Sequence, residues 1–489
     1  MNEGAFPQPS LPLAIRCNKT DSLCATVFGF RLTPLPFWLR VFFLSALFVL
    51  FASLVVSVID LWQYEGIDFL QRYVGAKFGL LGIEPYHATA DWWLNGIDKA
   101  FHETHFKGVP RPPGVGCNSP CLLLFYMPFT WFDFTTARYV SGALEWLAFL
   151  SVLCLMTRLI PRNRDRALTF SLILFFTAGA PFWRLHVERG QYYVFTCLLI
   201  ASSLVAHIKS NRPFLSGLLL GLTVVIRPTV AFLALPFALQ RRWRMLTGIA
   251  CACLFMGGAS LAVFGVEGWR QFIWISEKYE IASTDFETDH FADLLRGRDP
   301  LPIQDFEQSR KQGLAMLPSI NSTAAGMVRL SKPLLDRCSI PVTSVLFLAK
   351  LVGVSTAVAL ILAALYTRSR TPWPFAYLAY VGIVAVNLVE YAIPYRAAYA
   401  DIYYLLPVML GIPIVLRHRS VWLGVLLLVA LASQQNLLGL VHGWYAIPVR
   451  VAGLTLFSLG VLWHWRQSII SAPSAFDVTG ETGSSSVPA

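Results

Sequence analysis

The sequence predicts an all-α, polytopic membrane protein. Its 489 residues are 56% hydrophobic and only 14% charged, which is too apolar a balance for an ordinary soluble domain. Apolar runs of about 20 residues, the length that spans a hydrocarbon core as a helix, recur between Trp38 and Trp465. Basic residues gather in the short segments between these runs, as the positive-inside rule predicts for cytoplasmic loops. A soluble enzyme with a single anchor is therefore excluded.

The N-terminal part predicts a cytoplasmic segment followed by an uncleaved anchor. Residues 1–36 are polar and contain prolines, without the basic start and short apolar core of a cleaved signal peptide. We expect the first span at residues 37–59, leaving the membrane at Asp60. Residues 60–118 are then the first large extracytoplasmic loop, and residues 119–132 are long enough only for a half-helix on that side.

The segment 214–240 has basic residues at both ends, so we expect it to enter the membrane from the cytoplasmic side and return there. Its turning point is Arg227-Pro228, because proline lacks a backbone donor and restricts the residue before it. Broken helices at this depth occur where they line a cavity. A second large extracytoplasmic loop, residues 267–339, opens with aromatic residues that suggest amphipathic segments at the membrane surface.

The remaining spans follow from alternation between the two sides of the membrane. We expect them at about residues 135–159, 167–183, 191–208, 246–266, 342–366, 375–393, 403–416, 421–440 and 448–465. With the first span and the broken pair this makes about twelve passes. They form one transmembrane domain, residues 37–466, and the Ser-, Thr- and Gly-rich residues 467–489 are expected to be a disordered cytoplasmic tail.

Composition also limits the chemistry. The formal charge of +11 is accounted for by the cytoplasmic clusters, so we do not expect nucleic-acid binding. The nine cysteines are scattered without metal or redox spacing, and no nucleotide-binding or metalloprotease motif occurs. We therefore expect no metal and no cofactor. An outward-facing enzyme without a nucleotide site would need a lipid-linked donor.

Candidate site residues lie at the expected extracytoplasmic ends of spans. Asp60 and Asp68 are eight residues apart, roughly on one side of a continued helix, and a carboxylate there can act as a general base or only cap a helix. Arg227 lies inside a 27-residue apolar run, where a charge is costly and marks a functional site by default. It can hold a phosphate, or pair with Glu390.

Two outer turns carry further polar groups. The first holds Arg184, His186, Arg189 and Gln191, and the second follows Glu390 and includes Arg396. Arginine and histidine so close to the bilayer can bind a lipid phosphate, or simply cap helix ends. Both alternatives stay open at this point.

Four segments in order resemble glycosyltransferase family 87, the polyprenol-phosphate-mannose-dependent mannosyltransferases of the GT-C superfamily. Residues 68–86 look like its acidic-aromatic first-loop signature ending in G-x-x-P-Y, and Gly190-Gln191 opens a helix. Residues 216–229 are similar to its G-L-x-x-G-L motif, with Arg227 where lysine is usual. Residues 320–330 resemble its N-x-S-x-x-G-x-x-x-R-L segment.

The resemblance implies a GT-C-like fold and an inverting transfer. We expect a hexosyl transfer from a polyprenyl-phosphate-linked donor to a glycolipid or glycan acceptor. It implies Asp68 as the base, with the active site on the extracytoplasmic side of the plasma (inner) membrane. The donor phosphate is expected at Arg227, Arg184, His186, Arg189 and Arg396, and substrate contacts at Asp60, Tyr73, Tyr86, Gln191 and Asn321.

One departure concerns residues 395–407, which lack the histidine that many members have before a late L-L-P. Arg396 is expected to fill that role, or the substrate differs, so the sugar stays open between hexose and pentose. Two other classes also remain. A transporter or flippase of lipid-linked sugars would use Arg227 and the broken helix as its site, and a scaffold of the cell envelope would need neither aspartate.

Overall fold

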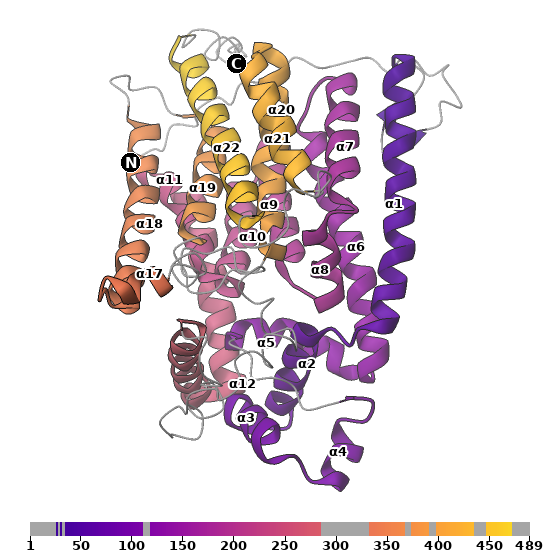
Figure 1. The fold of residues 1–489 in the computed structure, drawn as a ribbon, viewed down its shortest axis with the longest axis vertical. Coiled ribbons are helices and arrows are strands. Elements are labelled where there is room, and N and C mark those ends of the chain that lie inside the picture. Colours follow the sequence, from indigo (N-terminus) through magenta and orange to yellow (C-terminus); the bar gives the residue numbers. More distant parts are fainter. Residues whose placement is uncertain are drawn as a thin grey trace, which may run out of the picture.

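The structure, a computed structural model, describes residues 26–27, 30–31, 35–110, 118–284, 332–366, 373–390, 398–434 and 446–471. These residues are helical apart from their connections and one small hairpin, in which β1 (Thr26–Val27) pairs antiparallel with β2 (Phe30–Arg31). Figure 1 shows an upright bundle with a layer of shorter helices across one end. The all-α prediction is confirmed for the described residues outside the hairpin.

The first half of the bundle contains most of the polar clusters. Its helices are α1 (Phe37–Gln63), α2 (Ile67–Leu80), α3 (Pro85–Asn95), α4 (Lys99–His105), α5 (Pro120–Tyr126), η1 (Met127–Trp131), α6 (Phe134–Arg158), α7 (Asn163–Thr177), α8 (Pro181–Arg189), α9 (Tyr193–Ile208), α10 (Pro213–Ile226), η2 (Pro228–Ala234), α11 (Leu235–Leu239) and α12 (Trp243–Thr284).

The second half packs against this part through α19 and α20. Its helices are α17 (Lys332–Arg337), α18 (Val342–Leu365), α19 (Phe375–Glu390), η4 (Ala398–Tyr404), α20 (Leu405–His418), α21 (Val421–Gln434) and α22 (Ala446–Ser471). Most expected ranges agree with these bounds within a few residues. Helix α12 differs most, since it was expected at residues 246–266 and runs to Thr284, into the predicted second loop. The last helix runs to Ser471 and so includes the first residues assigned to the tail.

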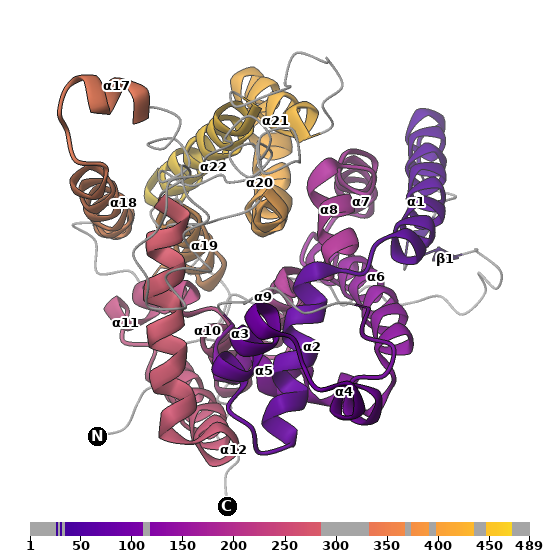
Figure 2. The same ribbon diagram turned by 60° about the horizontal axis from the view of Figure 1, so that its bottom comes forward.

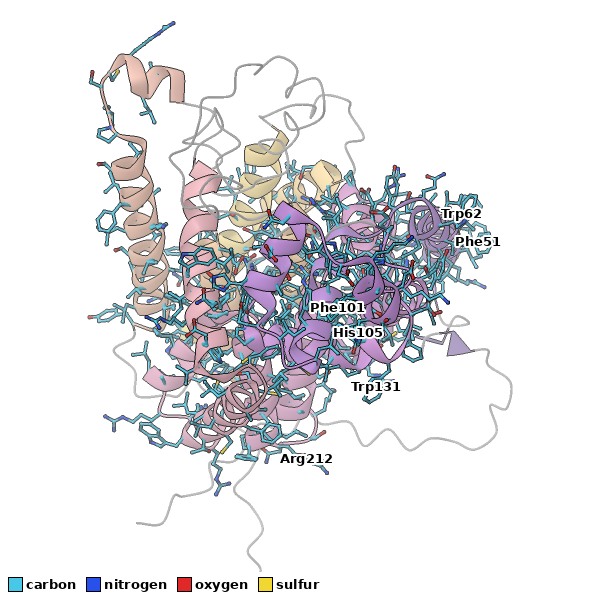
Figure 3. The ribbon with its side chains drawn as sticks, turned by 90° about the horizontal axis from the view of Figure 1, so that it is seen from below. Phe51, Trp62, Phe101, His105, Trp131 and Arg212 are labelled. Atoms are coloured by element: carbon cyan, nitrogen blue, oxygen red, sulfur yellow. The ribbon has the colours of Figure 1, made fainter. Side chains whose placement is uncertain are left out.

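Several helices are suited to a membrane. Five in the described ranges are long and apolar enough to cross one: Phe37–Gln63, Phe134–Arg158, Trp243–Ser276, Phe347–Leu365 and Ala400–His418. The outer face of α1 exposes Phe51 and Trp62, which point away from the other helices in Figure 3, as expected for a face in contact with lipid. A membrane protein is thus confirmed, whereas twelve passes and the arrangement of the loops remain predictions.

One sequence prediction needs correction. The helix expected at residues 167–183, followed by a turn at 184–190, is instead two helices, α7 and α8, bent by 68°. The bend follows Gly179 and Ala180, and Pro181 starts α8 in the first helical position, where the missing N–H of proline costs nothing. Arg184, His186 and Arg189 are therefore on a helix, and their spacing of two and three residues decides which way each side chain points.

The chain reverses at Arg227 as predicted. Its backbone is extended (φ −137°, ψ 96°) and separates α10 from η2. Before the reversal, Gly217 and Gly221 of α10 lie against α12. After it, Leu233 of η2 lies against Gly382 of α19. Phe237 then stacks on Phe375 at the start of α19, with ring centroids 5.0 Å apart.

The basic turns collect at one end of the bundle. Arg164 lies 5.8 Å from the Trp38 ring at the start of α1, which places the turn between α6 and α7 at that end. The end of α1 is distant from this turn, because Leu61 packs on Gly142 near the start of α6, and there Asp60 meets Arg184. One end of the bundle thus carries this basic turn, and the other carries ion pairs of both signs.

The layer at the opposite end consists of α2 to α5 with the second half of α12. Figure 2, turned to bring this layer forward, shows α2, α3 and α5 in front of α9 and α10. The predicted half-helix is confirmed as α5 and η1. Helix α12 enters the layer beside α2, where Phe264 packs on Gly79, and bends at Gly265 (φ 67°). Beyond the bend Trp274 stacks on His87, 5.3 Å away.

Candidate active site

Asp68 lies in the first turn of α2, where a negative charge is favoured by the helix dipole. Its side chain is 15% exposed, and Oδ2 lies 2.8 Å from Nε of Arg189 in an ion pair. Gln191 donates a short hydrogen bond to the same oxygen. Among the contacts of the described residues, none involves Oδ1 of Asp68. The carboxylate is therefore fixed by one oxygen and open at the other.

The approach of α2 to the end of α8 requires two glycines. Gly66 (φ 70°) precedes α2 and Gly190 (φ 69°) ends α8, a backbone region that other residues rarely adopt. A Cβ on Gly66 would lie 2.3 Å from Nε of Arg138, and one on Gly190 would lie 2.5 Å from Cβ of Phe69. Larger residues at these positions would push Asp68 away from Arg189.

Arg72, one turn after Asp68 on the same face of α2, connects the elements around the carboxylate. It donates from Nε to Oδ1 of Asn118 (3.0 Å), and from Nη1 and Nη2 to the Gly190 carbonyl and Oε1 of Gln191 (2.9 Å each). Its guanidinium also lies 4.8 Å from the centre of the Tyr192 ring. Arg72 thus holds Gln191, and through it Asp68.

A buried ionic group lies behind this turn. Arg138 of α6 donates to the carbonyls of Val187 and Glu188 at the end of α8, where a cation is favoured. Glu145, about two turns further along α6 and 3.9 Å from Arg138, accepts from Nδ1 of His186 at 3.0 Å.

His186 is fully buried, and its Nε2 accepts the backbone N–H of Val194 at 3.2 Å. Nδ1 must then carry the proton that bonds Glu145, so the ring is the neutral tautomer. Both nitrogens are used to hold α8, α6 and α9 together. The side chain that we expected at a phosphate lies inside the protein and positions the end of α8, which carries Arg189.

Arg184, on the other hand, points outward. It holds Asp60 through two hydrogen bonds of 2.8 Å, the bidentate geometry that guanidinium and carboxylate favour. Asp60 is almost fully buried, whereas the Arg184 side chain is 54% exposed. The pair joins the end of α1 to α8 and leaves one side of the guanidinium in contact with solvent or lipid headgroups.

Arg227 pairs with Glu390, the structural alternative that the sequence left open. Nε lies 2.8 Å from Oε1 of Glu390 and Nη2 donates to Oε2, while Thr229 bonds the same carboxylate. Nη1 donates to the Tyr192 hydroxyl at 3.2 Å. Tyr192 therefore lies between Arg72 and Arg227, and it connects the helix break to the turn beside Asp68.

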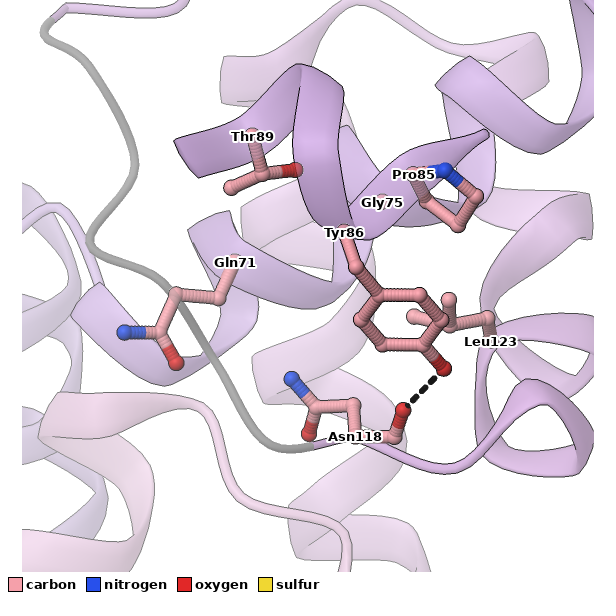
Figure 4. A pocket seen from close by; sticks show the side chains of 7 residues that line it. All are labelled: Gln71, Gly75, Pro85, Tyr86, Thr89, Asn118 and Leu123. Atoms are coloured by element: carbon pink, nitrogen blue, oxygen red, sulfur yellow. Dashed lines mark hydrogen bonds between the residues drawn. The ribbon is translucent and has the colours of Figure 1, made fainter. Parts of the chain in front are cut away.

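The two tyrosines expected at the substrate have partners in the protein. Tyr73 donates to the Phe132 carbonyl at 2.9 Å, and burial, with the nearby charge of Asp133, raises the pKa of Tyr73 to about 12. It stays a neutral donor at physiological pH. Tyr86 donates to the Asn118 carbonyl at 2.6 Å and lines a small pocket with Gln71, Thr89 and other residues (Figure 4).

Two expected residues, Arg396 and Asn321, lie outside the described residues. Within the described ranges no group of three or more histidine, cysteine, aspartate or glutamate side chains could hold a metal ion. The sequence reasoning missed Arg72, Arg138, Asn118 and Glu145. Arg138 and Glu145 had a usable signal, since they are charges inside a predicted span, and Arg72 lies four residues from Asp68.

A comparison with known proteins finds a family match for the middle of the chain. Residues 117–292 match the model of Glycosyltransferase family 87. The resemblance to this family is confirmed, while the GT-C fold and the mannosyl donor remain predictions. No curated protein and no solved structure matches the chain.

The matched part includes α5 to the second half of α12, and so contains Arg138, His186, Arg189 and Arg227, but it begins after Asp68. The family indicates a membrane glycosyltransferase, a class that needs a sugar donor and an acceptor. Outside the matched part, Asp68 places a carboxylate beside the partly buried guanidinium of Arg189.

Proposed function

We propose that the protein is an inverting glycosyltransferase that moves a sugar, mannose or another hexose, from a polyprenyl-phosphate donor to a hydroxyl of a glycolipid or glycan. The reaction takes place on the extracytoplasmic face of the plasma (inner) membrane, and needs no metal or nucleotide. The observation that carries the proposal is the Asp68 carboxylate, fixed through Oδ2 and open at Oδ1, in the first turn of a helix at the bundle end.

In this reaction the acceptor hydroxyl loses its proton to Oδ1 of Asp68 as its oxygen attacks C1 of the donor sugar. The bond between C1 and the phosphate oxygen breaks, and its electron pair leaves with the polyprenyl phosphate. Because the attack comes from the face opposite the leaving group, the configuration at C1 is inverted. Negative charge develops on the phosphate, so fixed cations beside the site lower the barrier.

Arg189 and Arg184 are the cations best placed for that charge, being partly exposed and 2.8 Å from Asp68 and Asp60. Arg227 contributes positive charge from the side of Tyr192 opposite Arg72. A contact of Arg396 with the phosphate remains part of the proposal. His186 acts as a positioning residue. Gln191 orients Asp68. Asp60, Tyr73 and Tyr86 are buried and act as positioning residues, and a substrate contact at Asn321 remains part of the proposal.

The separation of charges along the bundle supports the proposed side of the membrane. The basic turn between α6 and α7 lies at the end where α1 begins, and the positive-inside rule places such turns in the cytoplasm. Asp60 and Asp68 lie at the other end, which is then extracytoplasmic. A donor there must be carried by a lipid, because nucleotide sugars are made in the cytoplasm.

The transporter alternative would rest on the broken segment of α10 and η2. In a midplane substrate site the ends of the broken helices face the substrate, whereas here Arg227 is engaged by Glu390, Thr229 and Tyr192. The site at Asp68 has no counterpart in a transport pathway. We therefore favour the enzyme.

The test is transfer from radiolabelled polyprenyl-phosphate-mannose to a membrane lipid extract by purified protein in nanodiscs. Asp68→Asn should abolish most transfer, by about 10²- to 10⁴-fold as expected for loss of a general base, while leaving thermal stability near that of wild type. Asp98→Asn is the matched control, because Asp98 is an exposed N-cap of α4 and asparagine caps as well.

Unchanged transfer by Asp68→Asn in folded protein would refute the role of Asp68. If wild type fails with mannose, the same assay with a polyprenyl-phosphate pentose decides the sugar. Movement of intact donor across a vesicle membrane without a new product would establish the transporter instead.

A further inference from the structure

Four exposed arginines lie around the start of α1. Arg40 is in the first turn of α1, Arg158 ends α6, and Arg162 and Arg164 are at the start of α7. The Arg164 guanidinium lies 5.8 Å from the centre of the Trp38 ring. Because α1 and α7 lie side by side at this end of the bundle (Figure 1), residues far apart in the chain form one surface. We call the four residues the arginine cluster.

The described part of the chain does not neutralise this cluster. None of its four guanidinium groups forms a hydrogen bond or ion pair with a described residue. Arg166 differs, because it donates to the Ile160 carbonyl from Nε at 3.3 Å and from Nη2 at 3.0 Å and so closes the turn before α7. Asp165 is the only acid among residues 158–166, against four arginines. The cluster is therefore left with excess positive charge.

Helix capping does not account for the cluster. Arg40 and Arg164 lie in first turns, where the helix dipole disfavours a cation, and the side chain of Arg162 makes no capping hydrogen bond. The positive-inside rule accounts for a basic turn, but not for its position against α1. That position depends on packing further along the two helices, where Phe43 stacks on Phe170 with ring centroids 5.8 Å apart. A counter-charge from outside the chain would stabilise the arrangement.

The surface of α1 that continues from the cluster is apolar. Four side chains on the same face as Arg40 are 46% to 76% exposed, namely Phe37, Val41, Leu44 and Phe48. Their spacing of three and four residues keeps them in one strip, which extends about 12 Å from Arg40 to its far end. Trp38 is 49% exposed, and tryptophan prefers the level of lipid headgroups. The guanidinium beside its ring is then at the depth of lipid phosphates.

Charge and apolar surface together define the ligand. Guanidinium groups bind phosphate oxygens bidentately, and each basic side chain at a membrane surface strengthens binding of anionic lipid by about fivefold. A zwitterionic headgroup brings a second cation, which the cluster repels. A soluble phosphate leaves the strip on α1 uncovered. A molecule with an anionic phosphate and an apolar chain satisfies both parts of the surface.

We propose that the arginine cluster binds the phosphate of an anionic phospholipid, with one acyl chain along the apolar strip of α1. The lipid lies in the leaflet on the side where α1 begins, which is the cytoplasmic leaflet in the orientation proposed above. Its phosphate bridges α1 and the turn between α6 and α7. The site is at the end of the bundle opposite Asp68, so the inference does not depend on the transfer reaction.

The test compares photoreactive phosphatidylglycerol, with a diazirine on one acyl chain, with the matching phosphatidylcholine. The full chain is placed in phosphatidylcholine nanodiscs with a small share of either probe and irradiated, and labelled peptides are quantified by mass spectrometry. The cluster variants are Arg40→Gln and the double variant Arg162→Gln/Arg164→Gln. The matched control is Lys209→Gln/Arg212→Gln, which removes two exposed cations from the turn before α10, a helix that packs against α9 and α12.

In wild type the phosphatidylglycerol probe should label the strip on α1 at least about tenfold more than the phosphatidylcholine probe, as expected from two or more arginines. Arg40→Gln should reduce this preference about fivefold, and the double cluster variant should reduce it further. The control variant should match wild type. Labelling by phosphatidylcholine should be the same in all variants, which shows that α1 keeps its place in the membrane.

Equal labelling by the two probes in wild type, or an unchanged preference in the double cluster variant, overturns the site. Inorganic phosphate added at constant ionic strength should not displace the phosphatidylglycerol label, and displacement would assign the cluster to a soluble anion instead. A measurement on wild type alone covers variants that fail to fold. Sodium chloride should weaken the preference, because exposed charges are screened, and a preference insensitive to salt would contradict binding through the arginines.

Discussion

Arg72 illustrates how a single residue organises the site. Its guanidinium is almost fully buried and donates in three directions, to Asn118 of the pocket, to the Gly190 carbonyl and to Gln191. Only the planar fork of arginine can reach these three acceptors together. The side chain thereby fixes both the pocket and the turn that holds Asp68, without contacting the open oxygen of the carboxylate.

We therefore expect Arg72→Lys to reduce transfer by about 10²-fold, because misplacing a catalytic group by about 1 Å costs that much. The protein should fold but lose about 1–3 kcal/mol of stability from unsatisfied buried groups. Transfer kinetics and thermal unfolding in nanodiscs measure both effects. Lys77→Arg on the same helix is the control, and full activity of Arg72→Lys would contradict the positioning role.

At the level of elements, two departures from continuous helices bring the polar groups together. The bend between α7 and α8 turns Arg184 toward Asp60 and Arg189 toward Asp68. The reversal after α10 brings Arg227 to Tyr192, at the start of α9. Proline follows each break directly, as Pro181 and Pro228, so the sites of both bends are encoded locally.

The Arg227–Glu390 pair allows its structural and functional roles to be separated. Arg227→Met should destabilise the fold by about 3–5 kcal/mol, since Glu390 is left as an uncompensated buried charge. The double variant Arg227→Met/Glu390→Leu should recover most of that loss, because apolar replacements of buried pairs are tolerated. Thermal unfolding in nanodiscs measures this recovery.

The rate of sugar transfer by the same double variant tests the functional role of Arg227. If Arg227 stabilises the leaving phosphate, the double variant stays impaired, by at least about tenfold in kcat, despite its recovered stability. Wild-type turnover by the stable double variant would show that the pair only holds η2 and α19 together.

At the scale of the whole molecule, the charges are divided between the two ends of the bundle. Arg164 and the start of α1 share one end. Two further arginine contacts connect helix ends, from Arg242 to the Trp373 carbonyl at 3.4 Å and from Arg466 to the Tyr366 carbonyl at 2.8 Å. The short helices α2 to α5 cover the opposite end. Such a division is what a fixed orientation in the bilayer requires.

This orientation predicts which residues face the outside of the cell. In a background with the native cysteines replaced, Asp98→Cys should react with a membrane-impermeant maleimide in intact cells. Lys209→Cys should react only after permeabilisation, because it lies in a predicted cytoplasmic turn between α9 and α10. The reverse pattern would place the Asp68 site in the cytoplasm and exclude the proposed side of action.

Local patterns in the sequence were sufficient for most of the helices, and for part of the site. A span such as α6 is specified by its own apolar length, and a break such as Arg227-Pro228 by the chemistry of proline. Asp68 and Gln191 were expected at the site for the same local reason, their position beside a helix end. The bend at Pro181 was missed because a length criterion joins two apolar stretches across it.

By itself the sequence thus determined that this protein lies in a membrane, which segments are helical and where charges occur along them. Only the tertiary structure decided which charges are partners. Asp68 with Arg189, Arg72 with Asn118 and Arg227 with Glu390 are separated by 121, 46 and 163 residues in the chain. Hydrophobicity and helix propensity act over a few turns, whereas an ion pair depends on how whole helices pack, which no local pattern specifies.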